Sequence, residues 1–139
     1  MTANIIRVMI VDDHPQVRYG LSVFLDLWDD LQLVGEADNG EKALALAAQL
    51  HPNIILMDLS MPRMDGWKTR IQIRLDAKYQ EVAIIALSAH AMQGDIERAL
   101  KAGFDGYITK PIHIARIEED IRTTVFENAK LNKEQAESA

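Results

Sequence analysis

Charged and hydroxyl side chains follow four apolar segments of this chain, and together they could perform phosphate or metal chemistry. They are Asp12 and Asp13 after residues 5–11, Asp58 after residues 54–57, Ser88 after residues 82–87, and Lys110 after residues 105–109. Carboxylates gathered in one pocket repel each other unless a cation lies among them. Oxygen ligands favour a hard ion, Mg²⁺ first. The lysine and the serine would suit a phosphoryl group arriving at a carboxylate, because phosphoryl transfer requires mainly positioning and charge neutralisation.

The elements that must position these groups alternate along the chain. Residues 5–11, 54–57 and 82–87 are nearly continuous apolar runs, which are typical of strands buried on both faces. Residues 31–36 and 105–109 are weaker strand candidates. Apolar residues at three- and four-residue steps predict helices between them. These helices run from Val17 to Trp28, Ala43 to Leu50, Trp67 to Leu75, Ile96 to Leu100 and Ile114 to Val125.

This alternation predicts an α/β fold with a parallel sheet covered by helices on both sides. In such a sheet ligands bind beyond the carboxyl ends of the strands, where all the groups named above would lie. Each group also has a plainer interpretation. The pair Asp12-Asp13, Asp58 and Ser88 could cap helices, and Lys110 could be a solvated surface lysine. Their convergence on one edge favours function.

Composition excludes several classes of protein. The chain has 139 residues, which predicts one domain, and about two-thirds of the surface of such a chain can be buried. It has no cysteine, which excludes a disulfide scaffold, a thiolate zinc site and a cysteine nucleophile. The net charge of −6 argues against nucleic-acid binding by this chain. No apolar run approaches the roughly 20 residues of a membrane span, and no signal peptide is apparent. We expect a cytoplasmic protein without a membrane partner.

The motifs at the predicted strand ends resemble the receiver domain of two-component response regulators, of the chemotaxis response regulator type. The matching segments are Val11-Asp12-Asp13, residues 57–66 (Met-Asp-Leu-Ser-Met-Pro-Arg-Met-Asp-Gly), Ala86-Leu87-Ser88-Ala89, and residues 107–111 (Tyr-Ile-Thr-Lys-Pro). The resemblance covers residues 5–125 and implies a doubly wound, flavodoxin-like, five-stranded parallel sheet in the order 2-1-3-4-5. We expect a receiver domain over residues 1–126, and a polar C-terminal tail or helix extension over residues 127–139.

The resemblance also implies the role of each group. Asp58 would accept a phosphoryl group from a histidine kinase or a histidine phosphotransfer protein. The implied ligands of Mg²⁺ are Asp12, Asp13, Asp58 and the backbone carbonyl of Ser60. Ser88 and Lys110 would bind phosphoryl oxygens. The Lys110–Pro111 bond resembles the family's cis peptide. Such a domain is a phosphoacceptor switch with phosphotransfer and autodephosphorylation chemistry, and not an enzyme acting on an external substrate.

A conformational switch comes with the same resemblance. The hydroxyl of Ser88 would move toward the phosphoryl group, and the ring of Tyr107 would then turn inward. The alternative for Tyr107 is a packed ring with a solvated hydroxyl. The implied output surface lies around residues 96–101 and 107–117, formed by the fourth helix, the fifth strand and the fifth helix. A downstream protein or a second copy of the chain would bind there.

Two further positions could tune the lifetime of the acyl phosphate. Ser60 lies two residues after Asp58, and His90 lies two residues after Ser88. In receivers, residues at these positions influence how water reaches the acyl phosphate, although polar surface residues would look the same. The histidines are His14, His51, His90 and His113. No two of them have the spacing of zinc ligands, so we assign no metal to them.

Three other functions were weighed. A phosphatase of the haloacid-dehalogenase type carries a second aspartate two residues after its nucleophile, where this chain has Ser60. Residues 33–40 look like receivers that precede a helix-turn-helix domain, but the residues after the last predicted helix are too few for such a domain. The chain could still be a fragment of a longer regulator. A pseudo-receiver usually lacks part of the acidic pocket, whereas every key residue type is present here.

Overall fold

The apolar runs predicted to be strands form the centre of a parallel sheet in a computed structural model of the chain. The structure describes residues 5–61, 65–75, 81–89 and 92–138, without the side chains of residues 114, 115 and 129–138. In this part of the chain, five strands lie in the order β2-β1-β3-β4-β5. They are β1 (Ile6–Val11), β2 (Leu31–Ala37), β3 (Ile54–Asp58), β4 (Ala83–Ser88) and β5 (Gly106–Thr109). The predicted α/β class and strand order are confirmed.

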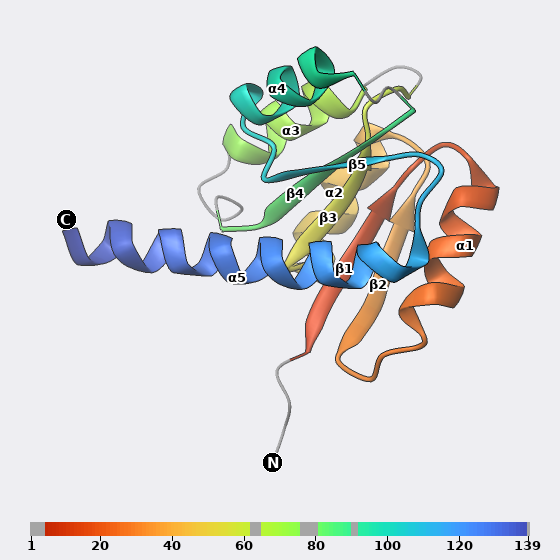
Figure 1. Ribbon diagram of the computed structural model, residues 1–139, viewed down its shortest axis with the longest axis horizontal. Helices are drawn as coiled ribbons and strands as arrows, with labels where there is room; N and C mark the ends of the chain where they lie inside the picture. Colours follow the sequence, from red (N-terminus) through yellow and green to blue (C-terminus); the bar gives the residue numbers. More distant parts are fainter. Residues whose placement is uncertain (1–4, 62–64, 76–80, 90–91, 139) are drawn as a thin grey trace.

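All the strand pairs are parallel, so the carboxyl ends of the strands meet at one edge. In Figure 1 the arrowheads of the strands mark this edge. The register brings Asp58 opposite Leu87 and Ser88 opposite Thr109. The polar groups that follow β1, β3, β4 and β5 therefore start from neighbouring points.

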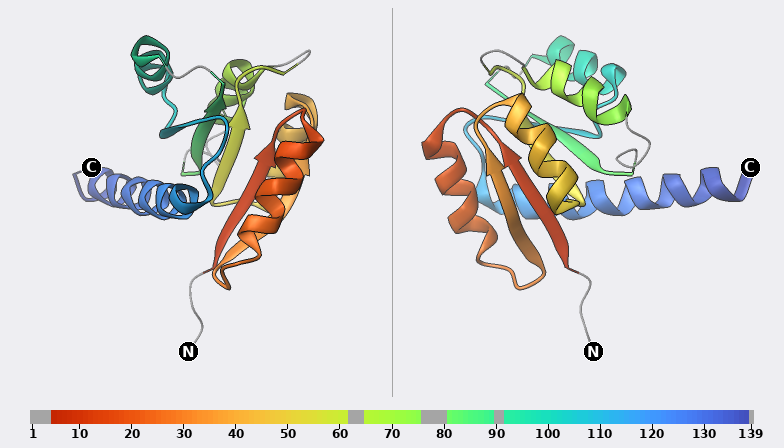
Figure 2. Two further views of the ribbon diagram at one scale, coloured as in Figure 1. Left: turned by 45° about the vertical axis from the view of Figure 1, so that its right-hand side comes forward. Right: turned by 180° about the vertical axis from the view of Figure 1, so that it is seen from behind.

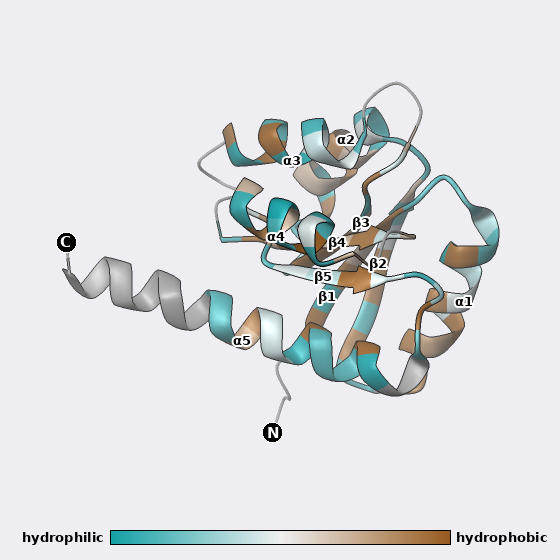
Figure 3. Ribbon diagram, turned by 45° about the horizontal axis from the view of Figure 1, so that its top comes forward, coloured by the Kyte–Doolittle hydropathy of each residue, from teal (hydrophilic) through white to brown (hydrophobic). Residues whose placement is uncertain are grey.

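Helices connect the strands and cover both faces of the sheet. They are α1 (Pro15–Leu25), α2 (Gly40–Leu50), α3 (Gly66–Leu75), α4 (Gln93–Ala102) and α5 (Ile114–Ser138). Seen from behind in Figure 2, α2 lies in front of the strands and α5 behind them. Figure 3 shows the hydrophobic residues concentrated on the strands and on parts of the surrounding helices.

The core is divided by the sheet because successive residues of a strand point to opposite faces. In the described part of the chain, Val8 and Ile10 pack on one face with residues of α1 and α5. Met9 and Val11 pack on the other face with residues of α2, α3 and α4. All four of these β1 side chains are fully buried. This two-sided burial is the reason why the central strands lack a polar alternation in the sequence.

The predicted boundaries differ from the observed ones by a few residues. The exception is α5, which runs to Ser138 and not only to Val125, and α1 ends at Leu25, whereas the apolar pattern continued to Trp28. Trp28 follows the helix and packs its ring on Phe24, with ring centroids 4.6 Å apart. The pattern thus recorded a local i,i+4 packing contact that continues beyond the end of the helix. On α4, Leu100 is half-exposed although it belongs to the predicted apolar stripe.

The last helix extends past the sheet. α5 runs for 25 residues, and Figure 1 shows its C-terminal half projecting away from the rest of the molecule. Residues 127–138 are therefore helical, while the division into a receiver domain at 1–126 and a tail stays a prediction. In the described part of the chain, no helix is both long and apolar enough to cross a membrane.

Candidate functional site

The carboxyl edge of the sheet brings the predicted charged residues into one cluster. Asp58 is the last residue of β3, Asp12 follows β1, and Lys110 follows β5. The Nζ of Lys110 lies 2.8 Å from Oδ2 of Asp12 and 3.5 Å from Oδ2 of Asp58. Asp13 lies next to them and offers a carboxylate oxygen to the same space. Residues far apart in the sequence thus form one acidic pocket closed by an ammonium group.

The pocket buries its charges. Asp12 is 0% exposed and Asp58 is 2% exposed. The backbone N–H of Ser60 donates to Oδ1 of Asp58 at 3.2 Å. By contrast, Oδ2 of Asp58 is buried and accepts no hydrogen bond from the described residues. Burying a carboxylate oxygen without a hydrogen bond costs free energy. A cation or a hydrogen-bond donor bound at Oδ2 of Asp58 would offset that cost.

Burial also changes the titration of Asp58. Loss of solvation, and to a lesser degree the charge of Asp12, raise the pKa of its carboxyl group from 3.8 to about 6. The Ser60 N–H group and the charge of Lys110 act in the opposite direction but do not compensate. Asp58 is therefore protonated more easily than an exposed aspartate, yet about 90% ionised at pH 7.

Hydrogen bonds hold the first aspartate of the pocket in place. The backbone N–H of Asp12 donates to the carbonyl of Ala37 at the end of β2, at 3.0 Å. A guanidinium N–H of Arg18 donates to the carbonyl of Asp12 at 2.7 Å. The backbone N–H of His14 donates to Oδ1 of Asp12 at 2.9 Å. Edge strand β2 and helix α1 thereby position Asp12.

Two residues of the sequence motif after Asp58, Asp65 and Gly66, have structural roles at the start of α3. Oδ1 of Asp65 accepts the backbone N–H of Lys68 at 2.9 Å and so caps the first turn of α3. Gly66 lies so close to β3 that a Cβ atom would come within 2.3 Å of the carbonyl oxygen of Asp58. Only glycine allows α3 to begin against the backbone of the pocket.

The predicted switch residues lie beside the pocket. Ser88 is buried at the end of β4, and its backbone carbonyl accepts the N–H of Lys110 at 2.7 Å. Ser88 and the half-buried Tyr107 line a cavity of about 390 Å³ between α3, α4 and β5. The guanidinium of Arg98 on α4 lies 4.7 Å from the ring centroid of Trp67 on α3, at the wall of this cavity.

The remaining predicted positions are placed as follows. Ser60 is exposed and lines the same cavity. The Lys110–Pro111 peptide bond is cis. His90 lies outside the described residues, as do residues 62–64 of the sequence motif. The structure therefore brings together the acidic residues and Lys110, and it places Ser88 and Tyr107 on the adjacent cavity.

Sequence reasoning missed one member of the pocket. The Nδ1 atom of His14 lies 2.9 Å from Oδ1 of Asp12 and 3.2 Å from Oδ1 of Asp13. The histidines were examined only for spacing to one another, which excluded a metal ligand. The sequence Asp12-Asp13-His14 contains a signal for this position. An imidazole directly follows two carboxylates in the segment that connects the first predicted strand to the first predicted helix.

The pocket suits a divalent cation. Asp12, Asp13, His14 and Asp58 each offer a ligand atom, and these atoms lie within 4.8 Å of one another. The carboxylate oxygens are hard ligands, and one of them is Asp58 Oδ2, which accepts no hydrogen bond from the described residues. A cation would relieve the repulsion that raises the pKa of Asp58.

Comparisons with known proteins agree with this geometry. The family model described as "Response regulator receiver domain" matches residues 8–122. The response regulator protein VraR of Staphylococcus aureus is 39% identical over 119 residues, which are 86% of this chain and 56% of VraR. This chain therefore spans just over half the length of that relative.

Solved structures of receivers have the same fold. The signal receiver domain of the putative response regulator NarL from Mycobacterium tuberculosis superposes with a TM-score of 0.78 and 30% identity, covering 88% of this chain and 98% of that one. The response regulator domain of CheB from Thermotoga maritima gives a TM-score of 0.79 and 30% identity, covering 88% and 97%. With the acidic pocket at the ends of β1 and β3, these matches show that the chain belongs to the family of response regulator receiver domains.

Proposed function

We propose that this receiver domain accepts a phosphoryl group on Asp58 from the phosphohistidine of a histidine kinase or a histidine phosphotransfer protein. The observation that carries the proposal is the position of Asp58: its carboxylate is buried at a strand end, its Oδ2 is unpartnered among the described residues, and Lys110 is 3.5 Å away. Response regulators as a family interact with such kinases and with output domains.

The residues of the pocket would divide the chemistry among them. A carboxylate oxygen of Asp58 attacks the phosphorus atom, and the P–N bond to the donor's imidazole breaks with its electrons left on that nitrogen. Lys110 moves from the carboxylates to a phosphoryl oxygen, and the Ser88 hydroxyl donates to another. The product is an acyl phosphate on the chain itself. The domain would therefore act as a switch, and not as an enzyme on an external substrate.

Receiver domains generally bind Mg²⁺ at an acidic cluster, and the residues of this pocket fit that ion. We expect the ligands to be the carboxylates of Asp12, Asp13 and Asp58 and the backbone carbonyl of Ser60. The bound ion supplies charge neutralisation for the arriving phosphoryl group. Ser60 and His90 are the positions at which we expect the lifetime of the acyl phosphate to be tuned.

The output surface would be the face of α4, β5 and α5. Ser88 leads toward α4, Lys110 follows β5, and Tyr107 on β5 lines the same cavity as Ser88. A phosphoryl group that attracts Ser88 and Lys110 acts directly on this face. Shifting a two-state equilibrium from 1:99 to 99:1 requires about 5.5 kcal/mol, which several charge-assisted contacts can supply. A downstream protein or a second copy of the chain would bind there.

The phosphoacceptor is tested by labelling with a small phosphodonor. We expect acetyl phosphate with Mg²⁺ to produce an acid-labile phosphoprotein, and Asp58→Asn to abolish it. A matched control is Asp38→Asn, because Asp38 follows β2 at the same sheet edge but pairs with Lys42 at 3.1 Å. The control should be labelled at the wild-type rate. Labelling of Asp58→Asn at that rate would disprove the assignment.

The output face is tested by NMR with and without beryllofluoride, a mimic of the bound phosphoryl group. We expect the largest chemical-shift changes away from Asp58 to fall in residues 96–101 and 107–117. The half-exposed Leu100 on α4 is a suitable reporter because it lies on the surface that a partner would contact. Changes confined to α1 and α2 would place the output elsewhere.

A further inference from the structure

The imidazole of His14 covers the acidic pocket from the solvent side. Its Nδ1 atom lies 2.9 Å from Asp12 Oδ1, 3.2 Å from Asp13 Oδ1 and 3.8 Å from Asp58 Oδ2. The side chain of His14 is 60% exposed, whereas those of Asp12 and Asp58 are 0% and 3% exposed. One nitrogen atom therefore faces all three carboxylates at the mouth of the pocket.

These separations match the edges of a metal coordination shell. Ligands about 2.1 Å from a transition ion are about 3.0 Å apart when adjacent in an octahedron and about 3.4 Å apart in a tetrahedron. The Nδ1 distance to Asp12, 2.9 Å, is close to the octahedral value, and that to Asp13, 3.2 Å, lies between the two values. The distance of 3.8 Å to Asp58 is within the span of about 4.2 Å between opposite octahedral ligands.

A second observation shows that the pocket lacks a ligand for its oxygens. Oδ2 of Asp58 is buried and accepts no hydrogen bond from the described residues, although it faces both His14 and Lys110. Oδ1 of Asp13 is likewise buried without a hydrogen bond in the described part of the chain. The Nζ of Lys110 lies closer to Asp12 Oδ2, at 2.8 Å, than to Asp58 Oδ2, at 3.5 Å.

The donor set distinguishes this pocket from one made of oxygen atoms alone. Carboxylate and carbonyl oxygens suit Mg²⁺, whereas imidazole nitrogen suits ions such as Co²⁺, Ni²⁺ and Zn²⁺. The hydrogen-bond geometry assigns the proton to Nδ1, because the facing oxygen of Asp12 is an acceptor. A transition ion would bind Nδ1 in the other neutral tautomer, which carries its proton on Nε2.

We propose that His14 is the nitrogen ligand of a mixed site, formed with Asp12, Asp13 and Asp58, that binds a divalent transition ion of the Co²⁺, Ni²⁺ or Zn²⁺ type. The proposal goes beyond the proposed function because such binding requires no phosphoryl transfer. It also separates two classes of ion: Mg²⁺ needs only the oxygens of the pocket, and the transition ion needs the imidazole as well.

The test is calorimetric titration of metal-stripped protein without a histidine tag, using Ni²⁺, Co²⁺ and Mg²⁺ as probes. We expect His14→Asn to weaken Ni²⁺ and Co²⁺ binding by at least about tenfold, the loss that even an outer-shell partner of a metal ligand causes. Mg²⁺ affinity should change by less than about twofold, since the carboxylates remain. His51→Asn is the matched control, because His51 is an exposed imidazole at the C-terminal end of α2.

A spectroscopic measurement excludes an indirect effect. Binding of Co²⁺ through His14 should give a visible absorption spectrum that changes in His14→Asn but not in His51→Asn. NMR should show the His14 ring resonances broadened at low Co²⁺ concentration and the His51 ring resonances unaffected. Unchanged Ni²⁺ and Co²⁺ affinity in His14→Asn, or an unchanged Co²⁺ spectrum, would overturn the proposal.

The same preparations separate this inference from the proposed function. Labelling of wild-type protein by acetyl phosphate with Mg²⁺ tests Asp58 alone. If labelling occurs and His14→Asn leaves transition-ion binding unchanged, only the inference about His14 fails. If the ions bind as expected and labelling is absent, only the proposed function fails.

Discussion

The two edges of the sheet each hold a cluster of charges, and the clusters are built in opposite ways. At the carboxyl edge, Asp12 and Asp58 are buried with incomplete pairing, and the pKa of Asp58 is raised to about 6 by burial. At the other edge, two guanidinium nitrogens of Arg122 donate to the two carboxylate oxygens of Asp30, one of them at 2.8 Å. This hydrogen bonding lowers the pKa of Asp30 and raises that of Arg122.

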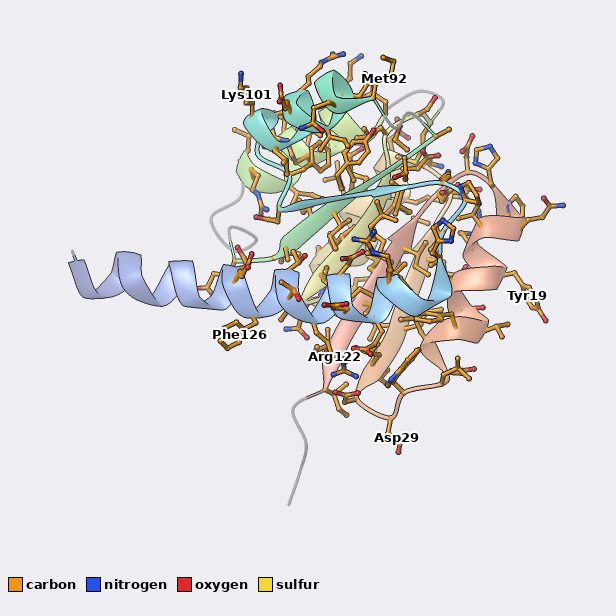
Figure 4. The ribbon with its side chains drawn as sticks, in the orientation of Figure 1. Tyr19, Asp29, Met92, Lys101, Arg122 and Phe126 are labelled. Atoms are coloured by element: carbon orange, nitrogen blue, oxygen red, sulfur yellow. The ribbon has the colours of Figure 1, made fainter. Side chains whose placement is uncertain are left out.

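The difference shows which cluster serves the fold. The Arg122–Asp30 pair joins α5 to the turn before β2. Each carboxylate oxygen of Asp30 accepts a hydrogen bond from Arg122. Figure 4 shows Arg122 near that turn, with the exposed Asp29 at its outer side. In the acidic pocket, by contrast, Oδ2 of Asp58 is buried without a hydrogen bond from the described residues. A protein retains such a destabilising arrangement where a ligand or a reaction uses it.

The largest effect should come from removing the charge of Asp58. Its pKa rises from 3.8 in the unfolded chain to about 6 in the fold, so the folded state binds more protons between these values and loses stability as pH rises through them. Without divalent ions, Asp58→Asn should stabilise the protein at pH 7 by up to about 3 kcal/mol. Urea unfolding in EDTA should show this gain shrink as pH falls from about 6.5 to about 4. A gain that is equal at all pH values would show that burial does not raise the pKa of Asp58.

A somewhat smaller change in stability, this time a loss, should follow from Gly66→Ala. The added Cβ would collide with the backbone of Asp58, which cannot move aside without shifting the pocket. We expect a loss of about 1–3 kcal/mol, as for other overpacked sites, together with slower labelling by acetyl phosphate. Gly20→Ala is the control: Gly20 lies within α1 with open space around it, and alanine should stabilise that helix. Equal stability of the two variants would contradict the close approach of α3 to β3.

The smallest effect should be at the satisfied cluster, and its sign should be opposite to that of Asp58→Asn. Asp30→Asn should lower stability at neutral pH, because the lowered pKa of Asp30 contributes stability above about pH 4 that is lost as pH falls through the folded value. The effect should diminish in salt, since the pair is partly exposed. Thermal unfolding at low and high salt measures it, with Asp29→Asn as the exposed neighbouring control. A stabilising effect of Asp30→Asn would remove the contrast between the two edges.

Much of the fold was predictable because its signals are local. Three apolar runs without polar alternation predicted the buried strands, and β1, β3 and β4 lie in the centre of the sheet. The edge strands were weaker candidates because one side of each is less covered, as the half-exposed residues of β2 show. Exact ends were less predictable, since Trp28 continues the apolar pattern of α1 by packing on Phe24 beyond the helix.

By itself, the sequence determined the kinds of groups at the carboxyl edge and their order along the chain. Residues that directly follow a parallel strand must emerge at one edge, so Asp12, Asp58 and Lys110 could be assigned to one pocket before any distance was known. The segment Asp65-Gly66 could be recognised as part of a motif, but the sequence did not show why an aspartate and a glycine are needed there. The helix cap and the close approach of α3 to the carbonyl of Asp58 depend on how two elements meet.

Only the tertiary structure decided how well each charge is paired. Whether Asp58 Oδ2 lacks a partner, whether His14 turns over the pocket, and whether Arg122 reaches Asp30 across 92 residues depend on where distant backbones place their side chains. Pairing in turn sets solvation and hence pKa, because the cost of burying a charge depends on every group around it. The same residue type, aspartate, is therefore a paired group with a lowered pKa at position 30 and a buried group with a raised pKa at position 58.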